Sequence, residues 1–169
     1  MIESHTIKSP TGNTVLVVED DVLVRECAVD ELNECGFKVL QAATAPEALL
    51  LLEGVHVDVV FTDINMPGEF DGLGLARRVR QRWPDIAIVI TSGRGCPDAC
   101  VEGARFLPKP YMFDTLARVM TEAVVRHALR EGPGSEPEVI PSADLGHGRA
   151  ALCGARDLHA PAATGARGG

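Results

Sequence analysis

The sequence lacks several features that would place the protein in common functional classes. No apolar run approaches the ~20 residues that a membrane-spanning helix needs. The first residues, Met1 to His5, carry no basic region followed by an apolar stretch, so no signal peptide is predicted. Basic residues are outnumbered, 16 against 24 acids, and the net charge of −8 argues against nucleic acid as a partner. These absences predict a cytoplasmic protein that is not inserted into a membrane.

Cysteines are also few and scattered. Their number is odd and no pair has the CxxC spacing, the five positions being Cys27, Cys35, Cys96, Cys100 and Cys153. A disulfide framework is therefore not expected, and we interpret these residues as thiols of a cytosolic protein. Cys96 and Cys100 could share one helical turn and bind a metal, but no histidine lies near them in the sequence, which makes this the weaker interpretation.

What the sequence does contain is an alternation of short apolar runs with helical patterns. Unbroken apolar runs of four or five residues are typical of strands buried on both faces, as in parallel sheets covered by helices. We predict strands at 15–18, 38–42, 57–62, 86–90 and 105–108, and helices at 22–34, 44–54, 72–83 and 113–130. This order predicts an α/β fold, a doubly wound parallel sheet with right-handed crossovers.

One connection in this pattern is irregular. Residues 93–103, between the fourth and fifth strands, contain three glycines and a proline. Glycine costs ~1 kcal/mol and proline ~3 kcal/mol in a helix interior. We therefore expect at most a short helix here, around 98–102.

Polar side chains stand where four of the predicted strands end. Glu19 and Asp20 follow the first, Asp63 the third, Thr91 the fourth and Lys109 the fifth. The carboxyl ends of parallel strands share one edge, where ligands of such sheets bind. Three converging carboxylates repel one another, and a hard divalent cation such as Mg²⁺ would neutralise them. An acceptor oxygen, a metal, an amine and a hydroxyl are what phosphoryl transfer requires.

At this point the chain resembles the receiver domain of bacterial two-component response regulators, the CheY-like fold, in its single-domain form. The resemblance covers roughly Thr14 to Arg130 and rests on the order and spacing of short motifs. These are Val17-Val18-Glu19-Asp20-Asp21, Thr62-Asp63-Ile64-Asn65-Met66-Pro67, Asp71-Gly72-Leu73, Thr91-Ser92-Gly93 and Pro108-Lys109-Pro110-Tyr111. It implies a flavodoxin-like five-stranded sheet in the order 2-1-3-4-5 with a short or irregular fourth helix.

The resemblance also implies a role for each residue at the strand ends. Asp63 matches the phosphoacceptor. Glu19 and Asp20 match the acidic pair that holds Mg²⁺ together with Asp63, and the backbone carbonyl of Asn65 matches a further metal ligand. The implied cofactor is therefore Mg²⁺, held by oxygen ligands.

Other matched positions concern the bound phosphoryl group and the response to it. Thr91 and Lys109 match residues that contact the group, and Pro110 matches a proline preceded by a cis peptide. Phe106 falls where the family places an aromatic residue whose rotamer reports activation, so Thr91 and Phe106 form the implied switch.

The sequence predicts three segments, an N-terminal extension at 1–13, a receiver domain at 14–131 and a tail at 132–169. The tail contains 8 Gly, 8 Ala and 4 Pro with no aromatic residue, too little apolar bulk to offset the entropy of ordering, so we expect it to be disordered. The loop at 68–70 is one residue longer than the commonest form in the family, which bears on partner selectivity.

The favoured function is a stand-alone phosphoacceptor rather than a turnover enzyme. It would take a phosphoryl group from a histidine kinase or histidine phosphotransfer protein and signal through an unnamed downstream protein, or act as a phosphate sink. The alternatives are a Mg²⁺-dependent phosphohydrolase with an aspartate nucleophile, of the haloacid-dehalogenase kind, and a dinucleotide-binding module. The first alternative places its nucleophile on the first strand. The second needs a glycine-rich turn where Glu19-Asp20-Asp21 stands. A weak homodimer, the cognate kinase and the signal stay open.

Overall fold

The computed structural model of this chain describes residues 12–95, 101–129 and 138–139. Its centre is one sheet in which every pairing is parallel, with the order β2-β1-β3-β4-β5-β6. The first five strands are those that the sequence predicts, within two residues at each end: β1 Thr14–Val18, β2 Lys38–Ala42, β3 Val59–Asp63, β4 Ala87–Ser92 and β5 Arg105–Pro108. The predicted order 2-1-3-4-5 is confirmed.

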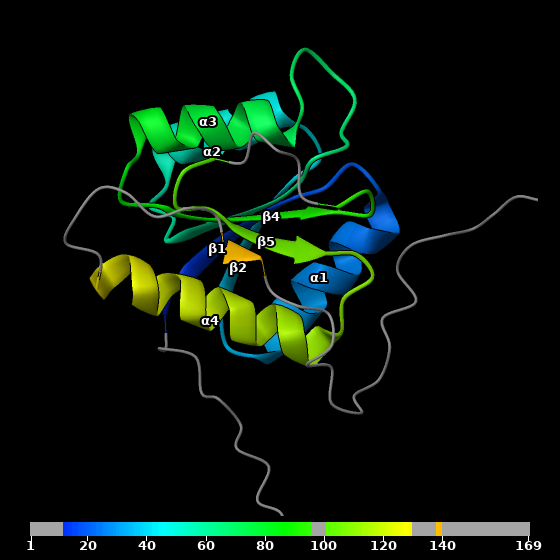
Figure 1. Cartoon of the computed structure of the whole chain (residues 1–169), viewed down its shortest axis with the longest axis vertical. Helices are drawn as coiled ribbons and strands as arrows, with labels where there is room; N and C mark the ends of the chain where they lie inside the picture. The colour runs from blue at the N-terminus through cyan, green and yellow to red at the C-terminus, as the bar shows by residue number, and fades with distance from the viewer. Residues whose placement is uncertain (1–11, 96–100, 130–137, 140–169) are drawn as a thin grey trace, which may run out of the picture.

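Helices cover both faces of the sheet (Figure 1). The described helices are α1 Val22–Glu34, α2 Ala45–Gly54, α3 Gly72–Arg82 and α4 Phe113–Leu129. α1 packs with α4 on one face and α2 with α3 on the other. None of these helices combines the length and apolar character that a bilayer crossing requires.

Successive strand residues supply two separate cores, which explains the unbroken apolar runs. Leu16 and Val60 point into the core beneath α2 and α3, whereas Val17 and Phe61 point into the core beneath α1 and α4. All four side chains are at most 3% exposed. Full burial of such a side chain contributes about 1.5–3 kcal/mol, so both cores hold the strand ends in place.

Side-chain caps fix where the helices begin relative to the strand ends. Asp21 caps α1, because its Oδ1 accepts hydrogen bonds from the amides of Leu23 at 2.9 Å and Val24 at 3.1 Å. Asp71 caps α3 in the same way, through the amide of Gly74 at 2.8 Å. Such caps contribute ~1 kcal/mol each. α1 therefore begins two residues after Asp20, whereas a loop of eight residues, 64–71, connects β3 to the capped start of α3.

The connection between β4 and β5 departs from the helical pattern of the others. Its described flanks, 93–95 and 101–104, contain no helix. The short helix predicted at 98–102 falls mostly on residues 96–100, outside the described part of the chain. Most of the predicted extension and most of the predicted tail lie outside it as well.

The structure corrects the sequence analysis at one point, because the sheet has a sixth strand. β6, Glu138–Val139, pairs in parallel with β5 within the segment for which the sequence predicted no structure. Its physical reason is the open edge of β5, which offers unpaired amide and carbonyl groups to any extended segment within reach. The average composition of a tail does not reveal such a local pairing.

Candidate functional site

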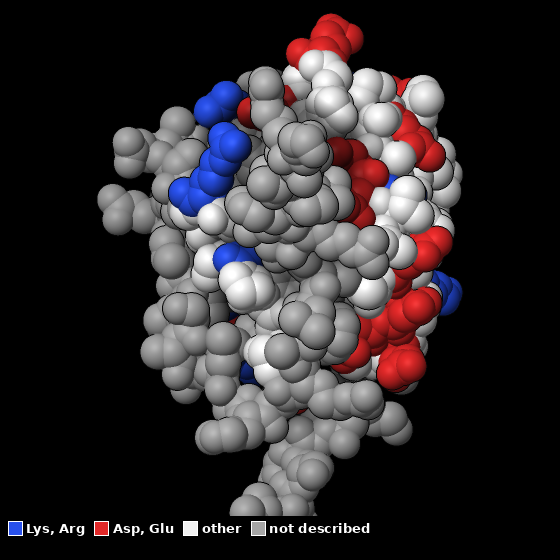
Figure 2. Space-filling model, turned by 90° about the vertical axis from the view of Figure 1, so that its right-hand side faces the viewer, with Lys and Arg blue, Asp and Glu red and all other residues white. Residues whose placement is uncertain are grey.

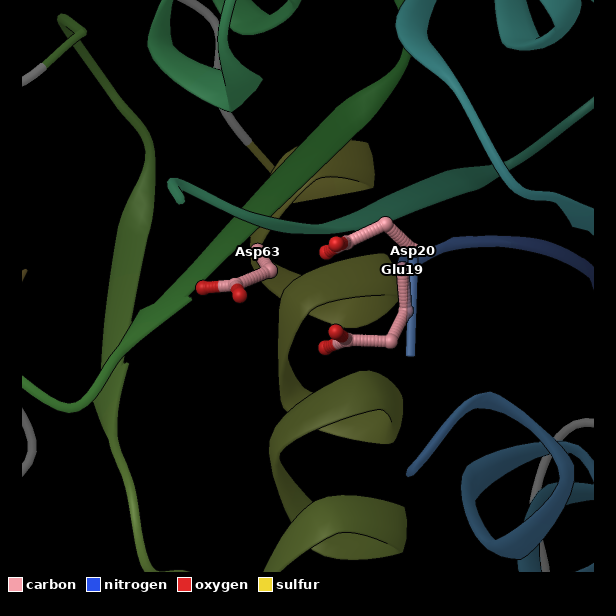
Figure 3. Close-up of side chains that lie close together, drawn as sticks. All are labelled: Glu19, Asp20 and Asp63. Atoms are coloured by element: carbon pink, nitrogen blue, oxygen red, sulfur yellow. The ribbon is translucent and has the colours of Figure 1, made fainter. Parts of the chain in front are cut away.

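The predicted acids meet at the carboxyl edge of the sheet. Figure 3 shows Glu19 and Asp20, which follow β1, with their carboxylates directed toward the side on which Asp63, the last residue of β3, lies. One carboxylate oxygen from each of the three lies within 4.8 Å of those of the others. Glu19 and Asp63 are only 5% and 7% exposed, whereas Asp20 is exposed.

A lysine reaches into this cluster from the loop after β5. Nζ of Lys109 lies 2.7 Å from Oε2 of Glu19 and 3.2 Å from Oδ2 of Asp63. Its backbone amide donates to the carbonyl of Ser92 at 3.0 Å, and the peptide bond to Pro110 is cis, as the resemblance implies. One ammonium therefore balances only one of the three carboxylates.

Two polar atoms at the centre of the site have no hydrogen-bond partner among the described residues. They are Oδ1 of Asp63 and Oγ1 of Thr91, and both are buried. The two residues are paired in register across β3 and β4, so they stand side by side at the sheet edge. An unsatisfied buried polar atom costs about 1–3 kcal/mol. One carboxylate oxygen of Asp63 is therefore without a donor or cation, although Lys109 contacts the other, and the Thr91 hydroxyl is without a hydrogen-bond partner among the described residues.

Burial and neighbouring charges shift the pKa values of both partners of the ion pair. Burial raises the pKa of Glu19, and the nearby Lys109 offsets this only in part. For Lys109 burial acts to lower the pKa, but the hydrogen bond and charge of Glu19 and the charge of Asp63 outweigh it, so this pKa is raised. A divalent cation among these groups would favour the charged form of every carboxylate. Three oxygen donors and an unpartnered carboxylate oxygen suit Mg²⁺.

The backbone around the acids is held by residues that the sequence analysis did not assign to the site. Nη1 of Arg25 donates to the carbonyl of Glu19 at 2.6 Å, and its Nε donates to Oε1 of Gln41 at 3.2 Å. Arg25 thereby ties α1, the acidic pair and β2 together. One feature of the sequence points to this role. Arg25 is the one basic residue of α1, and this helix begins directly after the acids.

The loop after β3 is held by two further contacts. Nδ2 of Asn65 donates to Oγ of Ser92 at 3.1 Å, which links this loop to the end of β4. Gly72 begins α3 so close to β3 that a Cβ atom there would lie 1.8 Å from the carbonyl oxygen of Asp63. Only glycine permits this approach. The motif Asp71-Gly72-Leu73 contains this glycine but does not by itself reveal the contact.

Phe106 lies apart from the acids. Its side chain is 2% exposed in the core beneath α2 and α3, and it is paired in register with Ile90, the residue before Thr91. The structure therefore brings together Glu19, Asp63 and Lys109 with Asp20 at the rim. Phe106 is connected to them through β4 and through its own strand β5, which Lys109 follows.

Charge is unevenly distributed around this end of the molecule. The strands β4 and β5 point toward the right in Figure 1, and Figure 2 views the molecule from that side. Acidic side chains gather on one flank of this face and basic side chains on the other. The exposed acids of α1, Glu26, Asp30 and Glu34, add to the negative charge.

Comparison with known proteins identifies the family that this fold and site define. Residues 15–121, more than half of the chain, match the response regulator receiver domain. The chain therefore belongs to the response regulator receiver family, and the recognition made from its motifs is confirmed.

The relatives include both regulators and kinases. The chain is 36% identical over 129 residues to the response regulator protein FleR of Pseudomonas aeruginosa, covering 73% of this chain and 26% of FleR. It is 40% identical over 118 residues to the sensor kinase CckA of Brucella abortus, covering 64% of this chain and 12% of CckA. The chain thus spans about a quarter or less of these two relatives.

Solved structures give the same result. The receiver domain of the hybrid histidine kinase CckA matches with a TM-score of 0.57 and 32% identity, covering 66% of this chain and 99% of that domain. NtrX from Brucella abortus matches with a TM-score of 0.65 and 30% identity, covering 70% of this chain and 28% of NtrX. Receiver domains accept phosphoryl groups from histidine kinases and generally bind Mg²⁺ at an acidic pocket. The acidic cluster of this chain is compatible with such binding.

Proposed function

We propose that this protein is a phosphoacceptor that receives a phosphoryl group on Asp63 from a histidine kinase or a histidine phosphotransfer protein. The observation that carries the proposal is the arrangement of the Asp63 carboxylate. Its Oδ2 lies 3.2 Å from the ammonium of Lys109, while its Oδ1 is buried and has no hydrogen-bond partner among the described residues. One oxygen is thus oriented by a fixed cation and the other is free to form a bond.

In the proposed reaction Oδ1 of Asp63 attacks the phosphorus of a phosphohistidine. The new P–O bond forms as the P–N bond breaks, the electron pair of that bond leaves with the imidazole, and the product is an acyl phosphate. Glu19 and Asp20 with the carbonyl of Asn65 would hold Mg²⁺ beside Asp63. The ion would neutralise carboxylates and phosphoryl oxygens when bound.

Thr91 and Lys109 would contact the transferred group. Oγ1 of Thr91 is buried next to Asp63 and has no described partner, so its hydroxyl is free to donate to a phosphoryl oxygen. Lys109 already contacts the acceptor carboxylate, and it would share its ammonium between Glu19 and the new anion. Fixed donors of this kind stabilise charge without reorganisation.

The output proposed for this event is a change in the surface that the protein presents to a partner. Thr91, drawn toward a phosphoryl oxygen, would shift β4, and Phe106 is paired with Ile90 on that strand. The two residues frame a connection whose described flanks, 93–95 and 101–104, contain no helix, so a rearrangement of these flanks breaks no helix. A partner then responds only through different affinities for the two states.

The acceptor assignment is tested by intact-mass measurement after incubation with a small acyl phosphate and Mg²⁺. We expect one added phosphoryl group in the wild-type protein and none in Asp63→Asn or with a chelator. Asp85→Asn, which makes the same change at an exposed acid far along the chain from β3, is the matched control and should be phosphorylated normally. A phosphorylated Asp63→Asn protein would show that the acceptor lies elsewhere.

A further inference from the structure

The outer edge of β5 is occupied by a segment of the same chain. β6 pairs in parallel with β5, with Glu138 opposite Arg105 and Val139 opposite Phe106. It is the short orange arrow beside β5 in Figure 1. An edge strand presents unpaired amide and carbonyl groups, and an added strand satisfies them. The edge of β5 is therefore a surface that takes an extended segment.

The chain order explains how β6 reaches this edge. β5, α4 and β6 form a further unit of strand, helix and parallel strand, like those that build the rest of the sheet. The connection at 130–137 can span at most about 28 Å, from ~3.5 Å per residue. A connection of this length holds β6 near its binding edge at an effective concentration in the millimolar range.

The charge at the start of β5 favours the segment that binds there. Arg105 is only 8% exposed, and its Nη2 lies 2.9 Å from Oε2 of Glu122. Its Nε and Nη1 are buried and have no hydrogen-bond partner among the described residues. A buried guanidinium with donors to spare favours another acid close by. The residue that the register places opposite Arg105 is an acid, Glu138.

We propose that β6 is a strap that closes the strand-binding edge of β5, so that an extended segment of a partner protein reaches this edge only after β6 detaches. Because β6 pairs through two residues, its hold is weak. An occupant with a millimolar Kd at a millimolar effective concentration is detached in about half of the molecules. A partner segment must therefore compete with β6 for the edge of β5, and β6 does not block this edge permanently.

The proposed strap is present in the unphosphorylated chain, so it is a feature separate from phosphoryl transfer. Val139 pairs with Phe106, so a shift of β5 would also change the backbone edge to which the strap pairs. Val139→Pro should still be phosphorylated at Asp63. The experiments on the strap therefore do not depend on whether Asp63 is the phosphoacceptor, and each proposal can be disproved without the other.

The strap itself is tested by NMR on the full-length, ¹⁵N-labelled protein. Cross-strand NOEs between the backbones of Phe106 and Val139 are expected in the wild type and in Ala151→Pro. They should vanish in Val139→Pro, because proline cannot donate to the ladder. Val139→Gly keeps the amide and should show them weakened, which provides a second variant if the proline change impairs folding. Absence of these NOEs in the wild type would overturn the proposal.

The edge is tested with a synthetic peptide that copies residues 136–141, Glu-Pro-Glu-Val-Ile-Pro. Added to full-length Val139→Pro, it should shift the amide signals of β5 with a half-maximal concentration about twofold lower than in the wild type, in which the strap occupies the edge in about half of the molecules. Equal titration of the two proteins, or no shift in either, would show that β5 is not a strand-binding edge closed by β6.

Two matched charge variants test the role of Arg105. Glu138→Lys puts a positive charge at the position paired with Arg105 and should lower the peptide concentration needed for half-maximal shift by up to about twofold, the limit that complete detachment of the strap sets. Glu136→Lys makes the same charge change two residues earlier and should have little effect. If both variants act alike, the charge of Arg105 does not select its occupant.

Discussion

Two regions of the molecule bury charged side chains. Hydrogen-bond acceptors are in excess in the first region, and hydrogen-bond donors are in excess in the second. At the carboxyl edge of the sheet, Lys109 faces two buried acids, and an acceptor oxygen of Asp63 is left over. At the start of β5, Arg105 faces one acid, Glu122, and two donor nitrogens are left over. The leftover groups differ in kind, a carboxylate oxygen in the first region and two N–H donors in the second.

The two regions also differ in exposure, which decides how much each ion pair contributes. The side chains of Lys109 and Glu19 are 17% and 7% exposed, whereas Glu122 is 36% exposed although Arg105 is buried. Water can replace Arg105 around Glu122 but not Lys109 around Glu19. The same substitution in the two regions should therefore have different consequences.

The largest expected effect tests this comparison directly. Lys109→Met leaves Glu19 and Asp63 buried without their cation, and we expect it to lower the free energy of unfolding by about 3–5 kcal/mol without metal. Arg105→Met leaves a half-exposed glutamate and should cost about 1 kcal/mol or less. Urea unfolding in chelator measures both. Equal losses would mean that the acidic site is no more desolvated than the edge of β5.

A smaller effect is expected from the close approach of α3 to β3. Gly72→Ala forces α3 away from the carbonyl of Asp63 and should destabilise the protein by about 1–3 kcal/mol. It should also slow phosphorylation, because it displaces the acceptor. Gly54→Ala, in open space near the end of α2, is the control and should be neutral or stabilising by up to ~1 kcal/mol. Thermal unfolding and intact-mass time courses give the two readouts, and a wild-type result for Gly72→Ala would contradict the geometry of this contact.

Metal binding should sharpen the contrast between the regions further. Mg²⁺ at ten times its Kd should stabilise the wild type by about 1.4 kcal/mol. Asp20→Asn should weaken this binding about tenfold and, by removing repulsion, slightly stabilise the metal-free protein. Asn65→Ala keeps its backbone carbonyl and should bind more tightly than Asp20→Asn. Thermal shift across a Mg²⁺ titration measures these values, and unchanged affinity in Asp20→Asn would remove that residue from the site.

The smallest effect concerns the thiol of Cys35, which lies near the acids Glu31, Glu34 and Asp114. Burial, together with the charge of Glu31 and a hydrogen bond to it, raises the pKa of Cys35 from 9.0 to about 11. At pH 8 about a thousandth of this thiol is ionised, so alkylation should be slow and should accelerate about tenfold per pH unit up to about pH 11. Glu31→Gln should raise the rate at pH 8. Mass spectrometry of the Cys35 peptide follows the reaction, and a rate that levels off near pH 9 would be inconsistent with the raised pKa.

Much of the fold was readable from the sequence because its signals are local. The apolar runs at 15–18 and 86–90 require burial on two faces, and Asp21 and Pro84 mark the limits of helices through caps and missing amides. Residues placed directly after buried parallel strands must meet at one edge of the sheet, so the sequence alone predicts the convergence of Asp63 and Glu19.

Only the tertiary structure decided the contacts that depend on distance between remote segments. The need for glycine at position 72 arises from the depth at which α3 packs on β3, and the hold of Arg25 on Glu19 arises from the turn of α1 over β2. β6 shows the limit most clearly. Two residues in a glycine-rich and proline-rich tail carry no strand pattern of their own, and they become a strand because β5 leaves an open edge within reach.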